Sequence, residues 1–287
     1  MLGAIIGDIV GSRWEFNPTN DYNFEWLSDR NDFTDDTICT VAVADALLNG
    51  SEDFGKYIHK WCRSYPKPKG GYGGRFAQWV HSDIPQPYNS FGNGAAMRVS
   101  PVAYCYEDEC QMLKAAEATA ACSHNHPEGI KGAKTVAMAI YTARELHQGC
   151  DVLGEKEIDY ILSQCTAVSN YDIEIEIAQV INRFDETCQG TVPVALWIIG
   201  ESTSFEDAVR KAVSLGADAD TLGAIVGRIA ESIWGIPVEM QLDAMKYLPT
   251  DMKRWWSDFT VDTTEIVLSL AMVMKVQQWI IMTALMQ

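Results

Sequence analysis

Two short clusters of aspartate and threonine are the residues best suited to chemistry. The first cluster holds Thr34, Asp35 and Asp36, and the second holds Asp218, Asp220 and Thr221. Hard divalent cations such as Mg²⁺ prefer oxygen ligands of these kinds. If the clusters meet in the fold, four carboxylates share one site, and two divalent cations would balance their charge. Without cations, mutual repulsion would raise some of the carboxyl pKa values.

Each cluster also has a simpler interpretation as a helix N-cap. Both clusters stand at the start of a helix-like pattern, and aspartate and threonine oxygens accept hydrogen bonds from the free N–H groups there. A helix needs one capping residue, however, and each cluster supplies a dense set. This surplus favours a metal site.

Two glycine-containing segments could contact an anion. Residues 70–75 (GGYGGR) would let backbone amides approach a phosphate, although a flexible turn is the commoner interpretation. They match neither a Walker A loop nor a dinucleotide fingerprint. Residues 90–94 (SFGNG) precede a helical pattern, so they form either an anion site or a plain turn. Phe91 could stack on a base or join the core.

Several single polar residues are candidates only in the right surroundings. Residues 123–128 (SHNHPE) resemble a helix entry with Pro127 near the first turn. His124 and His126 have no third soft ligand nearby for a metal site, so a contact with a ligand is the functional alternative. Glu15 becomes a proton-transfer candidate if a metal site and a pocket lie beside it. Asp8 interrupts an apolar stretch, so a buried position would require hydrogen-bond partners. It could brace metal-bound water.

Composition limits the classes of function. The 287 residues are 47% hydrophobic and carry a net charge of −17, which argues against a general nucleic-acid surface and an anionic membrane surface. The eight cysteines form no CxxC pair, and the start of the chain lacks a secretory signal, so we expect reduced core cysteines in a cytoplasmic protein. The apolar segment 266–286 is interrupted by polar residues, which favours a buried or oligomer-forming helix over a membrane span.

The hydrophobic periodicity is helical almost throughout. Helices are predicted over 38–48, 54–65, 94–106, 107–122, 128–148, 155–166, 191–201, 204–215, 220–234, 239–247 and 262–286. Only 171–177 alternates like a strand, and glycine and proline concentrate in loops at 65–75 and 83–94. We therefore predict an all-α orthogonal bundle in one domain over 1–258. The apolar helix at 259–287 would pack on this domain or form an oligomer contact.

Taken in order, these motifs resemble the ADP-ribosylglycohydrolase family, which includes the dinitrogenase-reductase-activating glycohydrolases and the ADP-ribosyl-acceptor hydrolases. The matching segments are 3–8 (GAIIGD) with Glu15, 33–37 (FTDDT), 71–74 (GYGG), 92–101 (GNGAAMRVSP), 123–124 (SH) with 127–128 (PE), 191–196 (TVPVAL) and 214–223 (SLGADADTLG). The resemblance spans about residues 3–250. The aspartate motifs are specific, whereas the glycine loops gain weight from their order. Ala217 after Gly216 and the tail after residue 258 depart from the family pattern.

The resemblance implies a ligand cleft with a dinuclear Mg²⁺ centre, for which Mn²⁺ is an alternative ion. The implied metal ligands are Thr34, Asp35, Asp36, Asp218, Asp220 and Thr221. The implied substrate-binding residues are Gly71, Gly73 and Gly74 for the diphosphate, Ser90 and Asn93 beside it, Phe91 against adenine, and His124. Glu15 would line the reaction end of the cleft. We expect Glu15 to act in proton transfer or to gate the substrate, and Asp36 is the alternative candidate for the base. Arg75 or Arg98 would supply positive potential for the anionic ligand.

The expected function is Mg²⁺-dependent hydrolysis of the N- or O-glycosidic bond between ADP-ribose and an acceptor. The partner would be an ADP-ribosylated protein or a small-molecule conjugate of ADP-ribose. A non-catalytic protein that binds ADP-ribose or a nucleotide is the alternative, and a two-metal phosphoesterase is a weaker one. The sequence does not identify the acceptor or the oligomeric state.

Overall fold

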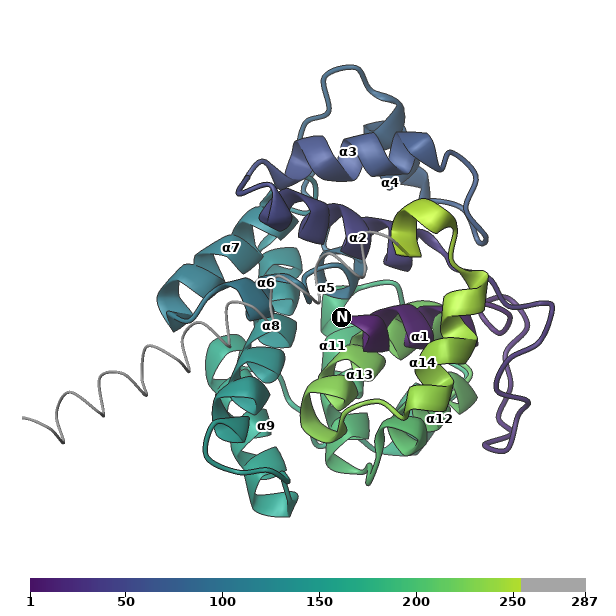
Figure 1. Cartoon of the computed structure of the whole chain (residues 1–287), viewed down its shortest axis with the longest axis vertical. Coiled ribbons are helices and arrows are strands. Elements are labelled where there is room, and N and C mark those ends of the chain that lie inside the picture. The colour runs from purple at the N-terminus through teal and green to yellow at the C-terminus, as the bar shows by residue number, and fades with distance from the viewer. Residues whose placement is uncertain (254–287) are drawn as a thin grey trace, which may run out of the picture. The chain divides into compact units, whose positions relative to one another are not determined.

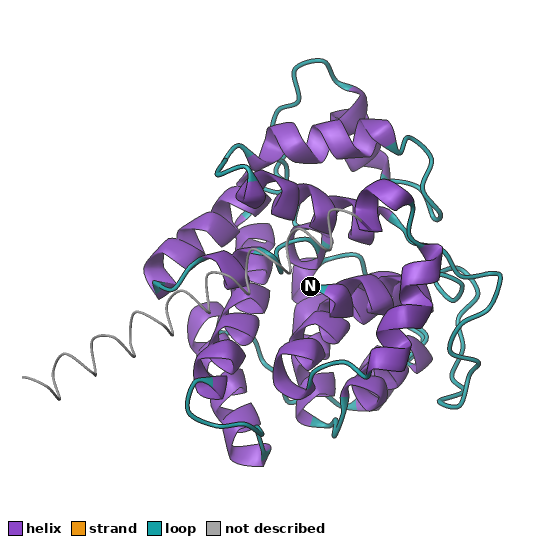
Figure 2. Ribbon diagram, in the orientation of Figure 1, coloured by secondary structure: helices purple, strands orange, loops and turns teal. Residues whose placement is uncertain are grey.

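Helices build the described part of the chain. A computed structural model describes residues 1–253, and these contain helices and loops without a β-sheet (Figures 1 and 2). The elements are α1 (Leu2–Gly11), α2 (Asp35–Leu48), α3 (Phe54–Ser64), α4 (Gly74–His81), α5 (Gly94–Met97), α6 (Val102–Cys105), α7 (Glu109–Ala121), α8 (Pro127–His147), α9 (Glu155–Ser169), α10 (Ile177–Val180), α11 (Cys188–Gly200), α12 (Phe205–Ser214), α13 (Ala219–Trp234), α14 (Val238–Ala244) and the 3₁₀ helix η1 (Met245–Tyr247). All belong to the unit Met1–Leu248, and Pro249–Gln287 form a second unit.

The all-α prediction is confirmed, and most helices begin and end within a few residues of the predicted bounds. The single helix expected over 94–106 was wrong, because the chain forms the short helices α5 and α6 with Pro101 between them. Proline lacks an N–H donor and disfavours helical backbone in the residue before it. The strand considered at 171–177 was also wrong: this segment is irregular and ends at α10. The helix predicted at 262–286 lies outside the described residues.

A stripe of small residues brings α1 and α13 into backbone contact. Gly3 and Gly7 on α1 face Gly227 and Gly223 on α13. A Cβ atom added to Gly7 would lie 1.9 Å from the carbonyl oxygen of Gly223, and one added to Gly3 would lie 2.2 Å from that of Gly227. Glycine every fourth residue on each helix therefore permits this approach. It places Asp8 beside the first turn of α13.

The other end of α1 is held by a half-buried carboxylate of α13. Glu231 Oε2 accepts hydrogen bonds from the N-terminal amine at 2.8 Å and from the Gly3 amide at 2.6 Å. Arg228 pairs with the same carboxylate and stacks over the Tyr104 ring at 3.9 Å. The carboxylate satisfies free amides of the first turn. Helix α1 is thus fixed to α13 along its whole length.

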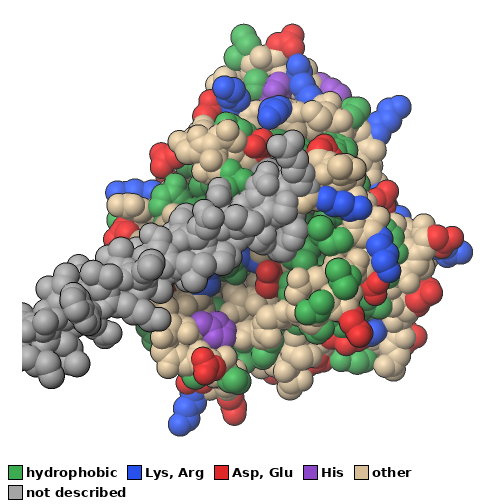
Figure 3. Space-filling model, in the orientation of Figure 1, with side chains coloured by type: hydrophobic (Ala, Val, Ile, Leu, Met, Phe, Trp, Pro, Cys, Tyr) green, Lys and Arg blue, Asp and Glu red, His purple; other side chains and the backbone are tan. Residues whose placement is uncertain are grey.

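Side-chain burial corrects one expectation from the sequence. All eight cysteines are free thiols, but Cys105, Cys110 and Cys150 are exposed rather than in the core. On the face drawn in Figure 3, lysine and arginine side chains are scattered among acidic ones instead of forming a patch. None of the helices within residues 1–253 combines the length and the hydrophobicity that crossing a bilayer requires.

Candidate active site and metal centre

Asp8 connects α1 to the start of α2. Its carboxylate is fully buried, and Oδ2 accepts hydrogen bonds from the Thr34 amide at 3.0 Å, the Thr37 amide at 3.1 Å and the Thr37 hydroxyl at 2.5 Å. These donors lie at the N-terminus of α2, where backbone amides lack helical partners. Asp8 therefore fixes the aspartates of the first turn of α2 relative to α1.

Asp36 lies between the hydroxyls of the two predicted clusters. Its Oδ2 accepts from Thr221 Oγ1 at 3.1 Å, and Thr34 Oγ1 lies 3.4 Å from the same oxygen. Thr34 also caps α2 by accepting from the Asp36 amide. The capping interpretation of Thr34 is therefore correct, and the two distant clusters also meet. Both Thr34 and Asp36 are buried, while Asp35 is partly exposed.

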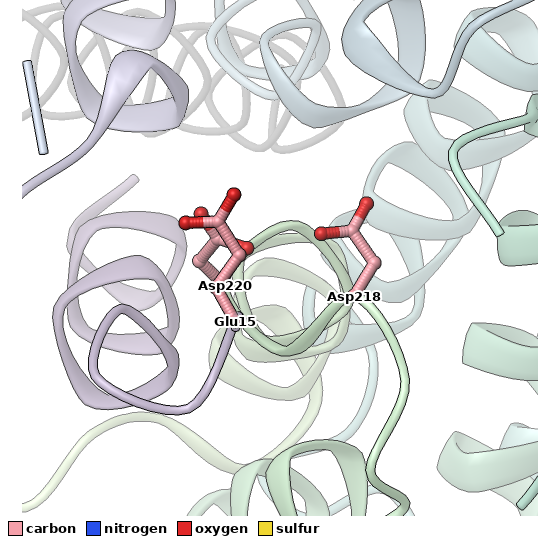
Figure 4. Close-up of side chains that lie close together, drawn as sticks. All are labelled: Glu15, Asp218 and Asp220. Atoms are coloured by element: carbon pink, nitrogen blue, oxygen red, sulfur yellow. The ribbon is translucent and has the colours of Figure 1, made fainter. Parts of the chain in front are cut away.

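The second cluster lies at the start of α13, with Asp218 at the N-cap position and Asp220 in the first turn. Asp218 Oδ2 accepts from the Asn93 side-chain amide at 2.7 Å, and the same amide group donates to Thr191 Oγ1 at 3.1 Å. Carboxylate oxygens of Glu15, Asp218 and Asp220 all lie within 4.8 Å of one another (Figure 4). This spacing allows one cation to contact all three.

Burial and mutual repulsion raise the pKa values of these carboxyl groups. Burial, followed by the charge of Asp220, raises the pKa of Asp8 to about 7. The same two causes, with smaller contributions from Asp35 and Asp8, raise the pKa of Glu15 to about 9. Burial and neighbouring carboxylates also hold the pKa values of Asp35 and Asp36 well above their usual range. Such a cluster needs protons or cations to offset its charge.

The site passes a simple test for cation binding. Four carboxylate oxygens with almost no solvent contact have no hydrogen-bond partner among the described residues. These are Asp8 Oδ1, Asp36 Oδ1, Asp220 Oδ1 and Glu15 Oε2. Buried polar atoms without a partner are rare and costly. Carboxylate oxygens without hydrogen-bond partners can act as metal ligands, and hard cations such as Mg²⁺ prefer oxygen ligands.

A cleft of about 460 Å³ opens above this cluster. Glu15, Asp35, Asp218, Asp220 and Thr221 lie along one part of its wall. The glycine-rich loop before α4 forms another part, with φ of +75° at Gly70 and +87° at Gly71. No atom lies within 4 Å of the position of a Cβ at Gly71, Gly73 or Gly74. The loop backbone is therefore open to a ligand.

His124 and Arg98 form a buried polar network at the wall of the cleft. Arg98 donates to the Thr119 carbonyl at 2.8 Å and to Ser123 Oγ at 2.7 Å, and Ser123 Oγ lies 2.8 Å from His124 Nδ1. Burial, followed by the positive charges of Arg98 and Arg75, lowers the pKa of His124 well below its usual value. A neutral His124 can therefore donate to or accept from a ligand at Nε2.

The remaining predicted contacts also line this cleft. Ser90 Oγ accepts from the Gly92 amide at 3.1 Å, and the exposed Phe91 ring packs edge-on against His126 at 5.3 Å. Arg75 stacks over the Tyr88 ring at 4.9 Å and donates to the Tyr88 carbonyl. Its positive charge therefore lies at the cleft wall.

Comparison with known proteins agrees with this arrangement. The model of the ADP-ribosylglycohydrolase family matches residues 1–274. The chain belongs to the ADP-ribosylglycohydrolase family. It is 25% identical to human ADP-ribosylhydrolase ARH3, over 88% of this chain and 90% of that protein. It is 22% identical to the ADP-ribosylarginine hydrolase Tri1 of Pseudomonas putida, over 82% and 70%.

A solved structure, described as an ADP-ribosylglycohydrolase-related protein complex, shares the fold with a TM-score of 0.63. Its sequence is 23% identical, and the alignment covers 86% of this chain and 94% of that one. Family membership makes this protein a hydrolase. The match to residue 274 extends beyond the stretch in which the resemblance was visible in the sequence.

Some residues that line the cleft of this ADP-ribosylglycohydrolase were not predicted from the sequence motifs. Phe16, Tyr88, Glu186 and Thr187 line it although none lies in a motif that suggested a role. The segment around Glu186 reaches the cleft by pairing with the 90–94 loop: the Glu186 carbonyl accepts from the Asn93 amide at 2.7 Å. Only the position of Phe16 directly after Glu15 offered a signal.

Proposed function

We propose that this protein hydrolyses the glycosidic bond between ADP-ribose and an acceptor, with Mg²⁺ as cofactor. The main support is the acidic cluster in the cleft, because several of its carboxylate oxygens have no hydrogen-bond partner. The glycine loop of the same cleft is open to a ligand. Asp35, Asp36, Asp218 and Asp220, with Thr34 and Thr221, would hold the cations. Bound Mg²⁺ would orient the ribose hydroxyls and stabilise negative charge that develops on oxygen.

The chain's own residues would bind and orient the substrate. Gly71, Gly73 and Gly74 line the cleft, where a diphosphate can approach the backbone without meeting a Cβ. Asn93 holds Asp218 through a 2.7 Å hydrogen bond and so keeps that carboxylate in place beneath the ligand. Arg75 and the loop amides supply local positive potential in a protein of net charge −17.

Glu15 is the better of the two predicted candidates for proton transfer. In hydrolysis, the bond from the anomeric carbon to the acceptor breaks, a water oxygen bonds to that carbon, and the leaving atom gains a proton. Glu15 lines the open cleft and has an unpartnered Oε2. Asp36 is buried, and its Oδ2 is occupied by the Thr221 hydroxyl. We therefore assign proton transfer to Glu15 and cation binding to Asp36.

The test measures binding and turnover separately. Calorimetry with ADP-ribose, without and with Mg²⁺ or Mn²⁺, should show binding that tightens with the cation. Incubation with ADP-ribosylated arginine and serine peptides should then release free ADP-ribose in wild type and not in Asp220→Asn. Exposed Asp172→Asn is the matched control and should retain full turnover.

Each alternative gives a distinct result. Tight binding of ADP-ribose with no turnover of any conjugate would indicate a non-catalytic binding protein. Release of phosphate or of a mononucleotide, in place of intact ADP-ribose, would indicate a phosphoesterase. Full turnover by Asp220→Asn at limiting Mg²⁺ would remove the acidic cluster from the mechanism.

A further inference from the structure

Two exposed phenylalanine rings meet at the edge of the cleft. Phe16 is 72% exposed and Phe184 is 46% exposed, and their ring centroids are 6.3 Å apart at an interplanar angle of 31°. Phe16 lies on the loop after α1, and Phe184 lies on the segment between α10 and α11. Exposed aromatic side chains that gather beside a functional cleft are characteristic of binding surfaces.

Both rings are anchored to the acidic cluster. Phe16 follows Glu15 directly and lines the same cleft. The segment that carries Phe184 is held by the Asn182 amide, which donates to the Leu215 carbonyl at 2.9 Å, three residues before Asp218. It is held on its other side by the Glu186 carbonyl. Backbone hydrogen bonds on both sides of Phe184 therefore tie its segment to the residues before Asp218 and to the 90–94 loop, and the ring contact joins Phe16 to Phe184.

The position beside Glu15 assigns the rings to the acceptor side. In the proposed reaction the bond that breaks would lie next to the acidic cluster, so the acceptor beyond that bond would lie beside Glu15 and Phe16. The other exposed ring of the cleft, Phe91, packs against His126 instead. The glycine loop and Arg75 accommodate the anionic part of the ligand.

The charge around the rings selects among acceptors. Glu186 lines the cleft near the pair, whereas the two arginines of the cleft wall are held at other residues, Arg75 at the Tyr88 carbonyl and Arg98 at the Thr119 carbonyl. Exposed aromatic faces beside the Glu186 carboxylate favour a planar cation, because a guanidinium gains from contact with both. A serine acceptor offers neither a flat face nor a charge.

We infer that Phe16 and Phe184 form an aromatic platform that contacts the acceptor and selects planar cationic acceptors, such as the guanidinium of an ADP-ribosylated arginine, over hydroxyl acceptors. This inference rests on the proposed hydrolysis of ADP-ribosyl conjugates. The two rings are specificity-determining residues, and neither takes part in the chemical step.

The experiment compares two peptides that differ only in the modified residue, ADP-ribosylated arginine or ADP-ribosylated serine. Phe16→Ala and Phe184→Ala should each lower kcat/KM for the arginine peptide by about tenfold, through KM, with about twofold or less change for the serine peptide. Phe16→Trp should retain the wild-type preference. Tyr160→Ala removes a ring on α9 that is 51% exposed and should change the hydrolysis of neither peptide.

The possible failures are distinguishable. Affinity for ADP-ribose with Mg²⁺ should be the same in all variants, which separates the platform from the ADP-ribose site and from loss of folding. The platform is refuted if the alanine variants lose kcat/KM equally on both peptides or on neither. It is also refuted if the wild type prefers the serine peptide. In each case the proposed hydrolase function is unaffected. If wild type binds ADP-ribose but cleaves neither peptide, the proposed function fails and the platform fails with it.

Discussion

Replacing Gly7 with alanine should inactivate the protein without touching a carboxylate. The new Cβ would lie 1.9 Å from the Gly223 carbonyl oxygen, about 1.5 Å short of ordinary contact at 3.4 Å. Neither atom is at the end of a flexible side chain, so α1 and α13 must separate. Asp8 lies on α1 and Asp220 on α13, and a misplacement of about 1 Å in an active site can lower the rate about a hundredfold.

The predicted stability loss is about 3 kcal/mol, at the upper end for overpacking, because two backbones rather than side chains must move. Urea unfolding and hydrolysis of an ADP-ribosylated peptide measure the two effects. Gly149→Ala is the control, since its Cβ would have no neighbour closer than 3.9 Å. Wild-type stability together with wild-type turnover in Gly7→Ala would refute the claim that close helix contact positions the site.

Three further outcomes follow from the site. Asp8→Asn should weaken Mg²⁺ binding by about 10- to 100-fold in calorimetry, because Asp8 orients the first turn of α2; unchanged affinity would contradict this role. Metal-free protein should lose stability as pH rises from 5 to 9: the raised pKa values of Asp8, about 7, and Glu15, about 9, mean that the folded state binds protons which the unfolded state releases. Urea unfolding at several pH values measures this loss, and a metal-free stability that does not change with pH would contradict the prediction. Saturating Mg²⁺ should reverse the pH trend. Arg98→Lys should cost about 2–4 kcal/mol in urea unfolding, because a lysine cannot reach both the Thr119 carbonyl and Ser123 Oγ; an effect no larger than that of exposed Arg183→Lys would show that the network contributes little.

Local sequence was sufficient for most helices but not for those interrupted by special residues. The helical period of apolar residues predicted α8 and α13 within one residue at each end. The pattern over 94–106 hid a break, because apolar residues continue through Pro101 although the helix cannot. The alternation at 171–177 looked like a strand, yet a strand needs a partner to pair its backbone groups, and no sheet exists among the described residues to provide one.

The residue types of the acidic clusters carried most of the information about chemistry. Oxygen donors in a dense set indicate hard cations wherever they fold, so Asp35, Asp36, Asp218 and Asp220 could be selected from sequence alone. The order of the motifs then indicated the family, which the comparisons confirm. Neither observation required knowledge of distances.

Only the tertiary structure decided that the clusters meet and what else surrounds them. The Thr221 hydroxyl reaches Asp36 because glycine stripes bring α1 against α13 and Asp8 binds α1 to α2. Contacts between segments so distant in sequence depend on packing, which no local pattern encodes. The same reason explains why the meeting of Phe16 and Phe184 was invisible in the sequence: exposed rings carry no periodic signal, and their proximity depends on two loops held by other parts of the fold.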